Sequence, residues 1–137
     1  MPVSNAGYLP RKASIVDSDL KDWWSAYEVN DKAALLVTRA LLDNATSDAV
    51  LINITAGLAH MPPTSGLSSY ATSKLANAKF YEYVQFEEPD LRVFDLHPGV
   101  IVTGMAKKAT AGGMVKDSFW DTREPAVTLV SSLLTLV

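Results

Sequence analysis

The stretch VLINITAGLAHMPPTSGLSSYATSKLANAKFYEYVQFEEPDLRVFDL, residues 50–96, determines the predicted fold. It opens with a short β-branched run at 50–54, typical of a buried strand, and a loop rich in Gly and Pro follows. A helix is expected from about residue 69 to 87, with Ser68 as its cap and Pro89 as its stop. A second strand is expected at 91–96. This order predicts parallel strands joined by a right-handed crossover, and therefore an α/β fold.

Upstream of this stretch, the sequence predicts one long helix that begins after an acidic cap at residues 17–19 and ends near Asn44. Residues 1–16 are expected to form a loop. The buried face of the helix is expected to recur at three- and four-residue steps, as Leu20, Trp23, Tyr27, Asn30, Ala34, Val37 and Leu41. Asn30 is the polar member of this stripe. A side chain bonded to its own helix backbone is the alternative to a functional role for it.

Downstream, His97-Pro98-Gly99 ends the second strand. Residues 105–121, which include Gly112-Gly113, are expected to form a loop. A last helix is predicted to begin around Glu124-Pro125, because Pro suits a first helical turn, and to continue to residue 137. No internal repeat or linker divides the chain, so residues 1–137 are treated as a single domain.

Composition excludes several classes of function. Of the 137 residues, 48% are hydrophobic and 20% are charged, which is ordinary for one globular domain. The net charge is -3 and no Lys/Arg cluster occurs, so nucleic-acid and membrane partners are not expected. The absence of cysteine, of a signal peptide and of a ~20-residue apolar run favours a cytoplasmic protein. His60 and His97 have no acidic partner at a ligand spacing, so no metal site is expected.

Tyr70 and Lys74 carry the most distinctive chemistry, because four residues separate them and they share one helix face. A nearby ammonium favours the phenolate and lowers a tyrosine pKa from about 10. Such a tyrosine can exchange a proton with a carbonyl or alcohol oxygen. An amphipathic surface helix with this spacing by chance is the alternative. The position after a strand and a Gly/Pro loop, where α/β folds place active sites, favours the functional interpretation.

Four further stretches accompany this pair in sequence order: Ser4-Asn5-Ala6-Gly7, Val29-Asn30, Asn53-Ile54-Thr55-Ala56 and Pro98-Gly99-Val100-Ile101-Val102-Thr103. Together with Tyr-x-x-x-Lys they resemble the short-chain dehydrogenase/reductase family. The wording of residues 53–60 most resembles fungal members. The resemblance implies a Rossmann-like, doubly wound parallel sheet. The chain would hold only part of it, because strands at the N-terminal side and the final strand are expected to be missing.

The resemblance also implies roles for individual residues. Tyr70 would be the general acid/base, Lys74 would hold the nicotinamide ribose and lower the pKa of Tyr70, and Asn30 would support a proton-relaying water. The backbone of Ile101 would meet the carboxamide and Thr103 the diphosphate. The cofactor would be NAD or NADP, and the residues expected to bind it are Asn5, Gly7, Tyr70, Lys74, Ile101 and Thr103.

Two departures from the family pattern put activity in doubt. The family's catalytic Ser, about 13 residues before the Tyr, falls at Ala56 or Gly57, and neither carries a hydroxyl. Thr55 is adjacent, but alternation along a strand is expected to point it the other way. The Thr-Gly-x-x-x-Gly-x-Gly motif, which holds the cofactor diphosphate, has no counterpart in the sequence.

Two hypotheses of function follow. The first is an oxidoreductase that moves a hydride between a nicotinamide cofactor and a small-molecule carbonyl/alcohol pair, impaired in this chain. The second is a non-catalytic remnant that binds a full-length relative. Homo- or hetero-oligomers would form through the helices at 18–44 and 68–87. The aromatic residues of the first helix, Trp23, Trp24 and Tyr27, belong either to its core face or to such an interface.

Overall fold

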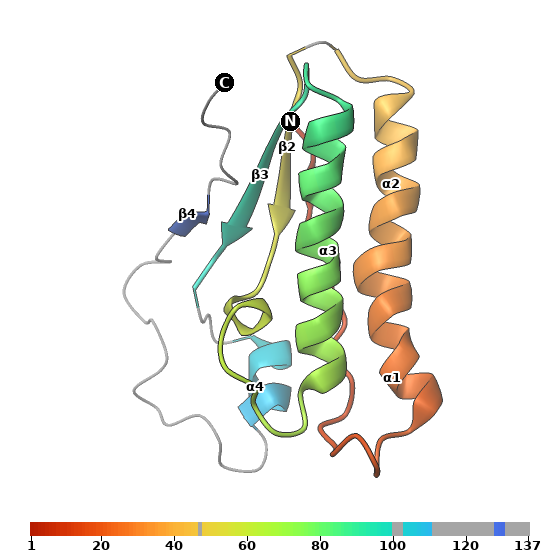
Figure 1. Ribbon diagram of the computed structural model, residues 1–137, viewed down its shortest axis with the longest axis vertical. Helices are drawn as coiled ribbons and strands as arrows, with labels where there is room; N and C mark the ends of the chain where they lie inside the picture. Colours follow the sequence, from red (N-terminus) through yellow and green to blue (C-terminus); the bar gives the residue numbers. More distant parts are fainter. Residues whose placement is uncertain (47, 100–102, 111–127, 131–137) are drawn as a thin grey trace.

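A computed structural model of the chain describes residues 1–46, 48–99, 103–110 and 128–130. Strands β1 (Val3–Ser4), β2 (Val50–Ile54), β3 (Arg92–His97) and β4 (Thr128–Val130) form one sheet in the order β1-β2-β3-β4 (Figure 1). The first three strands run parallel, with Leu51 opposite Val93 and Asn53 opposite Asp95. The predicted α/β fold with parallel strands is confirmed, and the architecture is a partial Rossmann-like fold.

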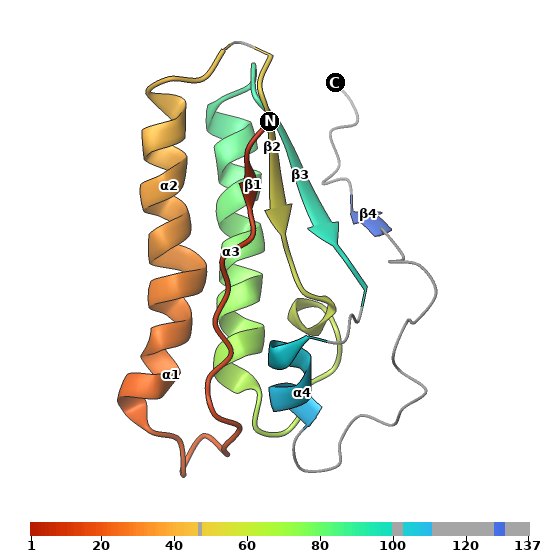
Figure 2. The ribbon, with the colours of Figure 1, turned by 180° about the vertical axis from the view of Figure 1, so that it is seen from behind.

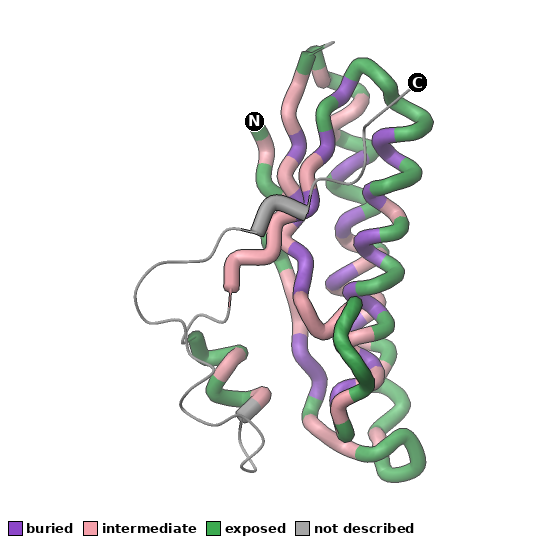
Figure 3. The backbone as a smooth tube through the Cα atoms, turned by 60° about the vertical axis from the view of Figure 1, so that its left-hand side comes forward, coloured by how far each residue is buried: buried purple, intermediate pink, exposed green. Residues whose placement is uncertain are grey.

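Two helical rods cover one face of this sheet. The first consists of α1 (Leu20–Tyr27), the π-helical turn η1 (Glu28–Lys32) and α2 (Ala33–Leu42), and the second is α3 (Ser68–Glu87). Both rods lie on the same side of β2 and β3, as Figures 1 and 3 show, and Figure 2 shows the arrangement from behind, with β1 beside β2. Among the described residues, no helix combines the length and apolar character needed to cross a bilayer.

The hydrophobic core lies between the sheet and the two rods. The strand residues alternate in burial along β2, as expected for a strand with one covered face. Half-buried side chains such as Leu41 and Phe80 complete the packing. The fully packed members of the core come from both strands and both rods: Ala34, Leu51, Tyr81, Val84, Leu91 and Val93.

The π-helical turn corrects the predicted stripe of the first rod. A regular helix was expected to bury Val37, but Val37 is 61% exposed, whereas the neighbouring Thr38 is only 2% exposed. The wide turn adds one residue to the helix at 28–32, so every later residue is rotated relative to a regular 3.6-residue repeat. Buried residues therefore recur at steps of four, as Ala26, Asn30, Ala34 and Thr38.

Helix ends also differ in detail from the expectation. Asp19 caps α1 as predicted, because its carboxylate accepts a hydrogen bond from the Asp22 amide at 2.7 Å. Ser68 was expected to cap α3 but is its first residue, and Leu67 precedes it. The Ser68 hydroxyl instead accepts a hydrogen bond from the indole of Trp23 at 3.3 Å. This contact ties the start of α3 to α1.

The C-terminal prediction was wrong where the structure describes it. Residues 128–130 were expected in a helix, but they form strand β4, antiparallel to β3, with Leu96 opposite Leu129. Thr-Leu-Val has a good strand propensity, and β3 offers a free edge of unpaired backbone groups. A short helix, α4 (Gly104–Thr110), also forms at the start of the predicted loop at 105–121. The rest of that loop and of the predicted helix lies outside the described residues.

Candidate active site

The carboxyl ends of the three parallel strands meet beside the N-terminal half of α3. Gly7 follows β1, Ala56 and Gly57 follow β2, and Gly99 follows β3. In open α/β sheets this edge is where ligands bind, since the loops that leave neighbouring strands diverge there. The predicted Tyr70 and Lys74 both lie on the part of α3 that runs past this edge.

Lys74 is buried at the center of this edge. Its side chain is only 5% exposed, and Nζ donates a hydrogen bond to the carbonyl oxygen of Ile54 at 2.8 Å. Burial lowers the pKa of the Lys74 amine, and the carboxylates of Asp31 and Asp95 partly oppose that shift. The last residue of β2 therefore positions the amine.

Asn30 is bonded across the molecule rather than along its own helix. Its Oδ1 accepts a hydrogen bond from the Tyr8 amide at 2.8 Å, and its Nδ2 donates to Ser73 Oγ at 2.8 Å and to the Tyr8 carbonyl at 3.2 Å. The backbone carbonyl of Asn30 accepts from Asn77 Nδ2 at 2.6 Å. The alternative of a side chain bonded locally to its own helix backbone is therefore wrong. Asn30 joins the loop after β1 to α3.

Gly7 brings two predicted residues to one point. A Cβ atom at Gly7 would lie 3.7 Å from Asn30 Oδ1 and 3.8 Å from Lys74 Nζ. The missing side chain of Gly7 thus lets both polar groups approach the loop after β1, where Met105 Cε also lies, at 3.8 Å from the same point. Asn5, two residues earlier, is exposed, and no contact of the described residues joins it to this group.

Tyr70 is half-buried one turn before Lys74, and burial raises the pKa of its phenol. The expectation that Lys74 lowers the Tyr70 pKa is wrong for this structure, because desolvation is the cause that acts on the phenol. The Lys74 ammonium donates its hydrogen bond to the Ile54 carbonyl and does not lower the pKa of the Tyr70 phenol in this structure.

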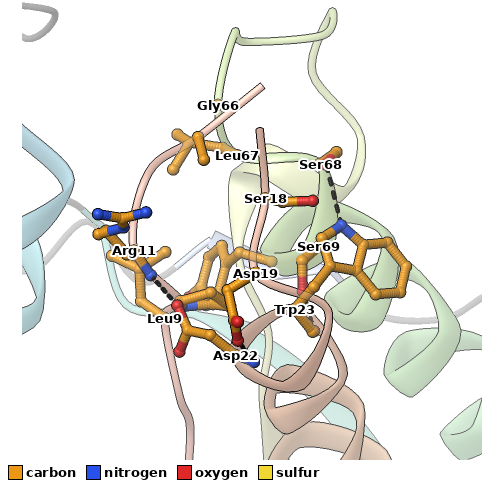
Figure 4. A pocket seen from close by; sticks show the side chains of 13 residues that line it. Leu9, Arg11, Ser18, Asp19, Asp22, Trp23, Gly66, Leu67, Ser68 and Ser69 are labelled. Carbon is orange, nitrogen blue, oxygen red and sulfur yellow. Dashed lines mark hydrogen bonds between the residues drawn. The ribbon is translucent and has the colours of Figure 1, made fainter. Parts of the chain in front are cut away.

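A small pocket borders Tyr70, between the loop after β1, the start of α1 and the loop before α3 (Figure 4). Its volume of about 10 Å³ is close to that of one water site. Two hydrogen bonds brace its wall: the Arg11 amide donates to Asp22 at 2.7 Å, and Trp23 donates to Ser68. Tyr70 is thus one of the residues that line this small pocket.

Two residues, Ala56 and Gly57, are candidates for the position of the family's catalytic serine, and their surroundings differ. Ala56 is buried, at 9% exposure. A Cβ atom at Gly57 would lie 3.1 Å from Nε2 of His97, so the imidazole already fills the space that a side chain there would need. Thr55 is 6% exposed, and its hydroxyl has no hydrogen-bond partner among the described residues. Thr55 directly follows β2 and continues the pattern in which every second residue, Leu51 and Asn53 before it, is buried.

The loop after β3 is described only in part. Thr103 is exposed, and its Oγ1 accepts a hydrogen bond from the Ala106 amide at 3.1 Å, which caps α4. No described contact connects it to Lys74 or Asn30. Ile101 lies outside the described residues. Within the described ranges, no group of three or more His, Asp or Glu side chains is suited to a metal ion.

Four residues of the site were missed by the sequence interpretation: Tyr8, Asp31, Ser73 and Asn77. A signal for two of them was available. Ser73 and Asn77 continue Ser69 at steps of four on α3, and all three are buried. Three polar residues on the buried face of a helix indicate a polar network. Tyr8 is held through its backbone, which sequence alone does not reveal.

Comparisons with known proteins agree with this geometry. The model of the short chain dehydrogenase family matches residues 1–113. Short chain dehydrogenase pigC of Monascus ruber is 38% identical over 102 residues, covering 71% of this chain and 33% of the relative. Short chain dehydrogenase mpl6 of Monascus purpureus is 32% identical over 108 residues, covering 76% and 37%. The resemblance to fungal members is thus confirmed.

A solved structure shows the same relationship. A short chain dehydrogenase from Burkholderia cenocepacia J2315, in complex with NADP, superposes with a TM-score of 0.68 at 27% identity, covering 75% of this chain and 42% of that one. The chain spans about a third of the length of the curated Monascus relatives. With the family model matching most of its residues, the chain belongs to the short-chain dehydrogenase/reductase family.

Proposed function

We propose that the chain takes part in hydride transfer between NAD(P)(H) and a carbonyl/alcohol pair, with reduced activity because a catalytic hydroxyl is absent. The observation that carries the proposal is the meeting of Gly7, Asn30 and Lys74 at one point beside the half-buried Tyr70. Tyr70 would donate or accept the substrate proton, because it is the tyrosine of the Tyr-x-x-x-Lys pattern and its phenol carries an exchangeable proton.

The residues present fit the nicotinamide end of a dinucleotide. Lys74 Nζ and Asn30 Oδ1 converge at Gly7 beside Met105 Cε, so a ribose hydroxyl held at this point would find a donor and an acceptor. The cofactor, when bound, supplies the hydride. Support for NAD(P) comes from the relative solved with NADP. We also assign Asn5, Ile101 and Thr103 to the cofactor site, by family resemblance.

Affinity for the cofactor is expected to be low. Dinucleotides gain much of their affinity where the diphosphate meets a Gly-rich turn and a helix N-terminus, and the sequence holds no Thr-Gly-x-x-x-Gly-x-Gly motif. A loss of ~4 kcal/mol raises Kd about a thousandfold. We expect neither NAD(H) nor NADP(H) to bind tighter than roughly millimolar. Titration of nicotinamide fluorescence measures this, and a micromolar Kd would contradict it.

Turnover tests the function itself. With NADPH or NADH at the same high, subsaturating concentration throughout and a panel of small ketones and aldehydes, Tyr70→Phe should lower turnover by about 10²–10⁴ because it removes the general acid. Tyr83→Phe is the matched control, since Tyr83 lies on the same helix and is 57% exposed. No turnover by the wild-type chain, or equal turnover in Tyr70→Phe, would refute catalysis by these residues.

A second function is favoured by the outer surface of the helical rods. Trp24, Leu36 and Val37 of the first rod are 52%, 56% and 61% exposed, and Phe86 of α3 is 81% exposed. Trp24 packs against Trp23 and Tyr27, which stack on each other, and the ring centroids of the three lie 5.1–5.3 Å apart. An exposed apolar surface of this kind marks a protein interface. We therefore propose, as the alternative, that the chain binds a second copy or a full-length relative through residues 18–44 and 68–87.

Co-purification separates the two functions. A full-length relative that is coexpressed with this chain should be retained by it, and Trp24→Ala should weaken the complex. Val16→Ala is the control, because Val16 is an exposed apolar residue outside both segments, residues 18–44 and 68–87. A chain that stays monomeric beside such a relative contradicts the second function and leaves the first untouched.

A further inference from the structure

His97 is a half-buried imidazole at the carboxyl end of β3, and the function proposed above does not use it. Val93 of the same strand packs in the core beneath the helical rods, and Asp95, two residues later, is also buried. Side chains alternate along a strand, so the ring of His97 lies on this same face of the sheet. On this face α3 carries Tyr70 and Lys74 past the strand ends.

The imidazole occupies the space that a side chain at residue 57 would take. Gly57 opens the short 3₁₀ turn η2 (Gly57–Ala59), which follows β2 and contacts α3. A Cβ atom at Gly57 would lie 3.1 Å from His97 Nε2 and 3.6 Å from its Cε1. The catalytic serine of the family falls at Ala56 or Gly57. A ring nitrogen of His97 therefore lies beside the position at which the family pattern has a hydroxyl.

A hydrogen bond in the turn after β3 determines which nitrogen of this ring carries the proton. The Gly99 amide donates to His97 Nδ1 at 3.3 Å, so Nδ1 is the accepting nitrogen. Gly99 has a φ of 82°, a left-handed value that glycine adopts without steric cost. In a neutral imidazole one nitrogen accepts and the other donates, so the proton is on Nε2. Among the described residues, the Nε2–H group has no hydrogen-bond acceptor.

We propose that His97 is a catalytic residue whose Nε2–H group donates a hydrogen bond to the reacting oxygen of a small ketone or aldehyde, in place of the absent hydroxyl. This role rests on the proposed function and names the donor that remains for it in this chain. A neutral imidazole can polarise a carbonyl oxygen in this way. Burial lowers the pKa of His97 from 6.5, which favours the neutral ring at neutral pH.

The alternative is a purely structural ring, which fills the space at Gly57 and holds the turn at Gly99 without contacting substrate. The first measurement uses the wild-type chain without cofactor. Long-range ¹H–¹⁵N correlation at neutral pH should place the His97 proton on Nε2, and acetone should shift the Nε2 resonance saturably. His60 is the internal control, because it is the other histidine, is exposed and should not respond to acetone. A proton on Nδ1, or an Nε2 resonance that acetone leaves unmoved, overturns the proposal.

Turnover of ketones then separates a hydrogen-bond donor from a structural ring. His97→Leu should lower turnover by about 10²-fold, the contribution of one donor to a developing oxyanion. His97→Gln should retain most of the turnover, because its side-chain amide also donates. In Ala56→Ser, where a hydroxyl supplies a donor, the loss caused by His97→Leu should shrink to about tenfold or less. His60→Leu is the matched control and should leave turnover unchanged.

Several outcomes of the turnover measurement contradict the donor role of His97. These are wild-type turnover in a folded His97→Leu, an equal loss in His97→Gln, and an equal loss with and without Ala56→Ser. The NMR measurement decides the matter where His97→Leu does not fold, because it needs no variant. An inactive wild-type chain in which acetone still shifts the Nε2 resonance counts against the proposed function alone, since that shift does not depend on hydride transfer.

Discussion

The two halves of α3 pack against the same sheet with opposite chemistry. Its N-terminal half, residues 68–77, buries the polar side chains Ser69, Ser73, Lys74 and Asn77. Its C-terminal half, residues 78–87, buries mainly apolar side chains, among them Ala78, Tyr81 and Val84. A single helix thus serves the candidate site at one end and the core at the other. Stability should reside in the second half, and the first half should carry chemistry at some cost in stability.

The largest expected effect belongs to the apolar half. Tyr81→Ala should lower the free energy of unfolding by about 3–5 kcal/mol, because Tyr81 is 1% exposed and lies in the core cluster. Denaturant unfolding measures the change. Phe86→Ala, at an exposed position of the same half, should stay within about 0.5 kcal/mol of the wild type. Equal losses of unfolding free energy in the two variants would contradict the assignment of stability to the buried apolar residues of this half of α3.

The next largest effect concerns the catalytic hydroxyl that is missing at Ala56 and Gly57. Ala56→Ser should raise turnover by about 10²-fold, since one donor to a developing oxyanion contributes about that much. Gly57→Ser should bring no such gain and should lower stability, because its Cβ would meet His97 Nε2 at 3.1 Å. Parallel rate and unfolding measurements on both variants decide which position corresponds to the family's serine. A gain only in Gly57→Ser would contradict this expectation and identify residue 57 as the position of the serine.

The smallest effect is a gain in stability from removing a site residue. The pKa of Lys74 is lowered in the folded chain, so the buried charge destabilises the fold at every pH below that pKa. The cost fades as pH rises from the folded pKa toward 10.5. Lys74→Met should therefore melt about 4 °C higher at pH 7, roughly 1 kcal/mol, and the difference should shrink near pH 10. A lower melting temperature at pH 7 would place Lys74 among the stabilising residues.

The regular elements of residues 50–96 could be predicted because each depends on local pattern. The strand at 50–54 has the predicted bounds, and the helix and second strand begin within one residue of the expected positions. Tyr70, Lys74 and Asn30 were likewise visible as residues in motifs. The rest depends on non-local geometry. No pattern reveals a one-residue widening at 28–32, the backbone contact of Tyr8 to Asn30, or the pairing of residues 128–130 with β3.

The π-helical turn makes the length of the first rod as important as its sequence. Loss of a single codon within 28–32 would turn the wide turn into a regular one and rotate the two flanking helices by about 100° relative to each other. Either Asn30 would leave the site, or Thr38 would give up its buried place beside Tyr81. An in-frame deletion here would thus act more severely than most substitutions. Among natural variants of this chain, the number of residues in this segment should stay fixed.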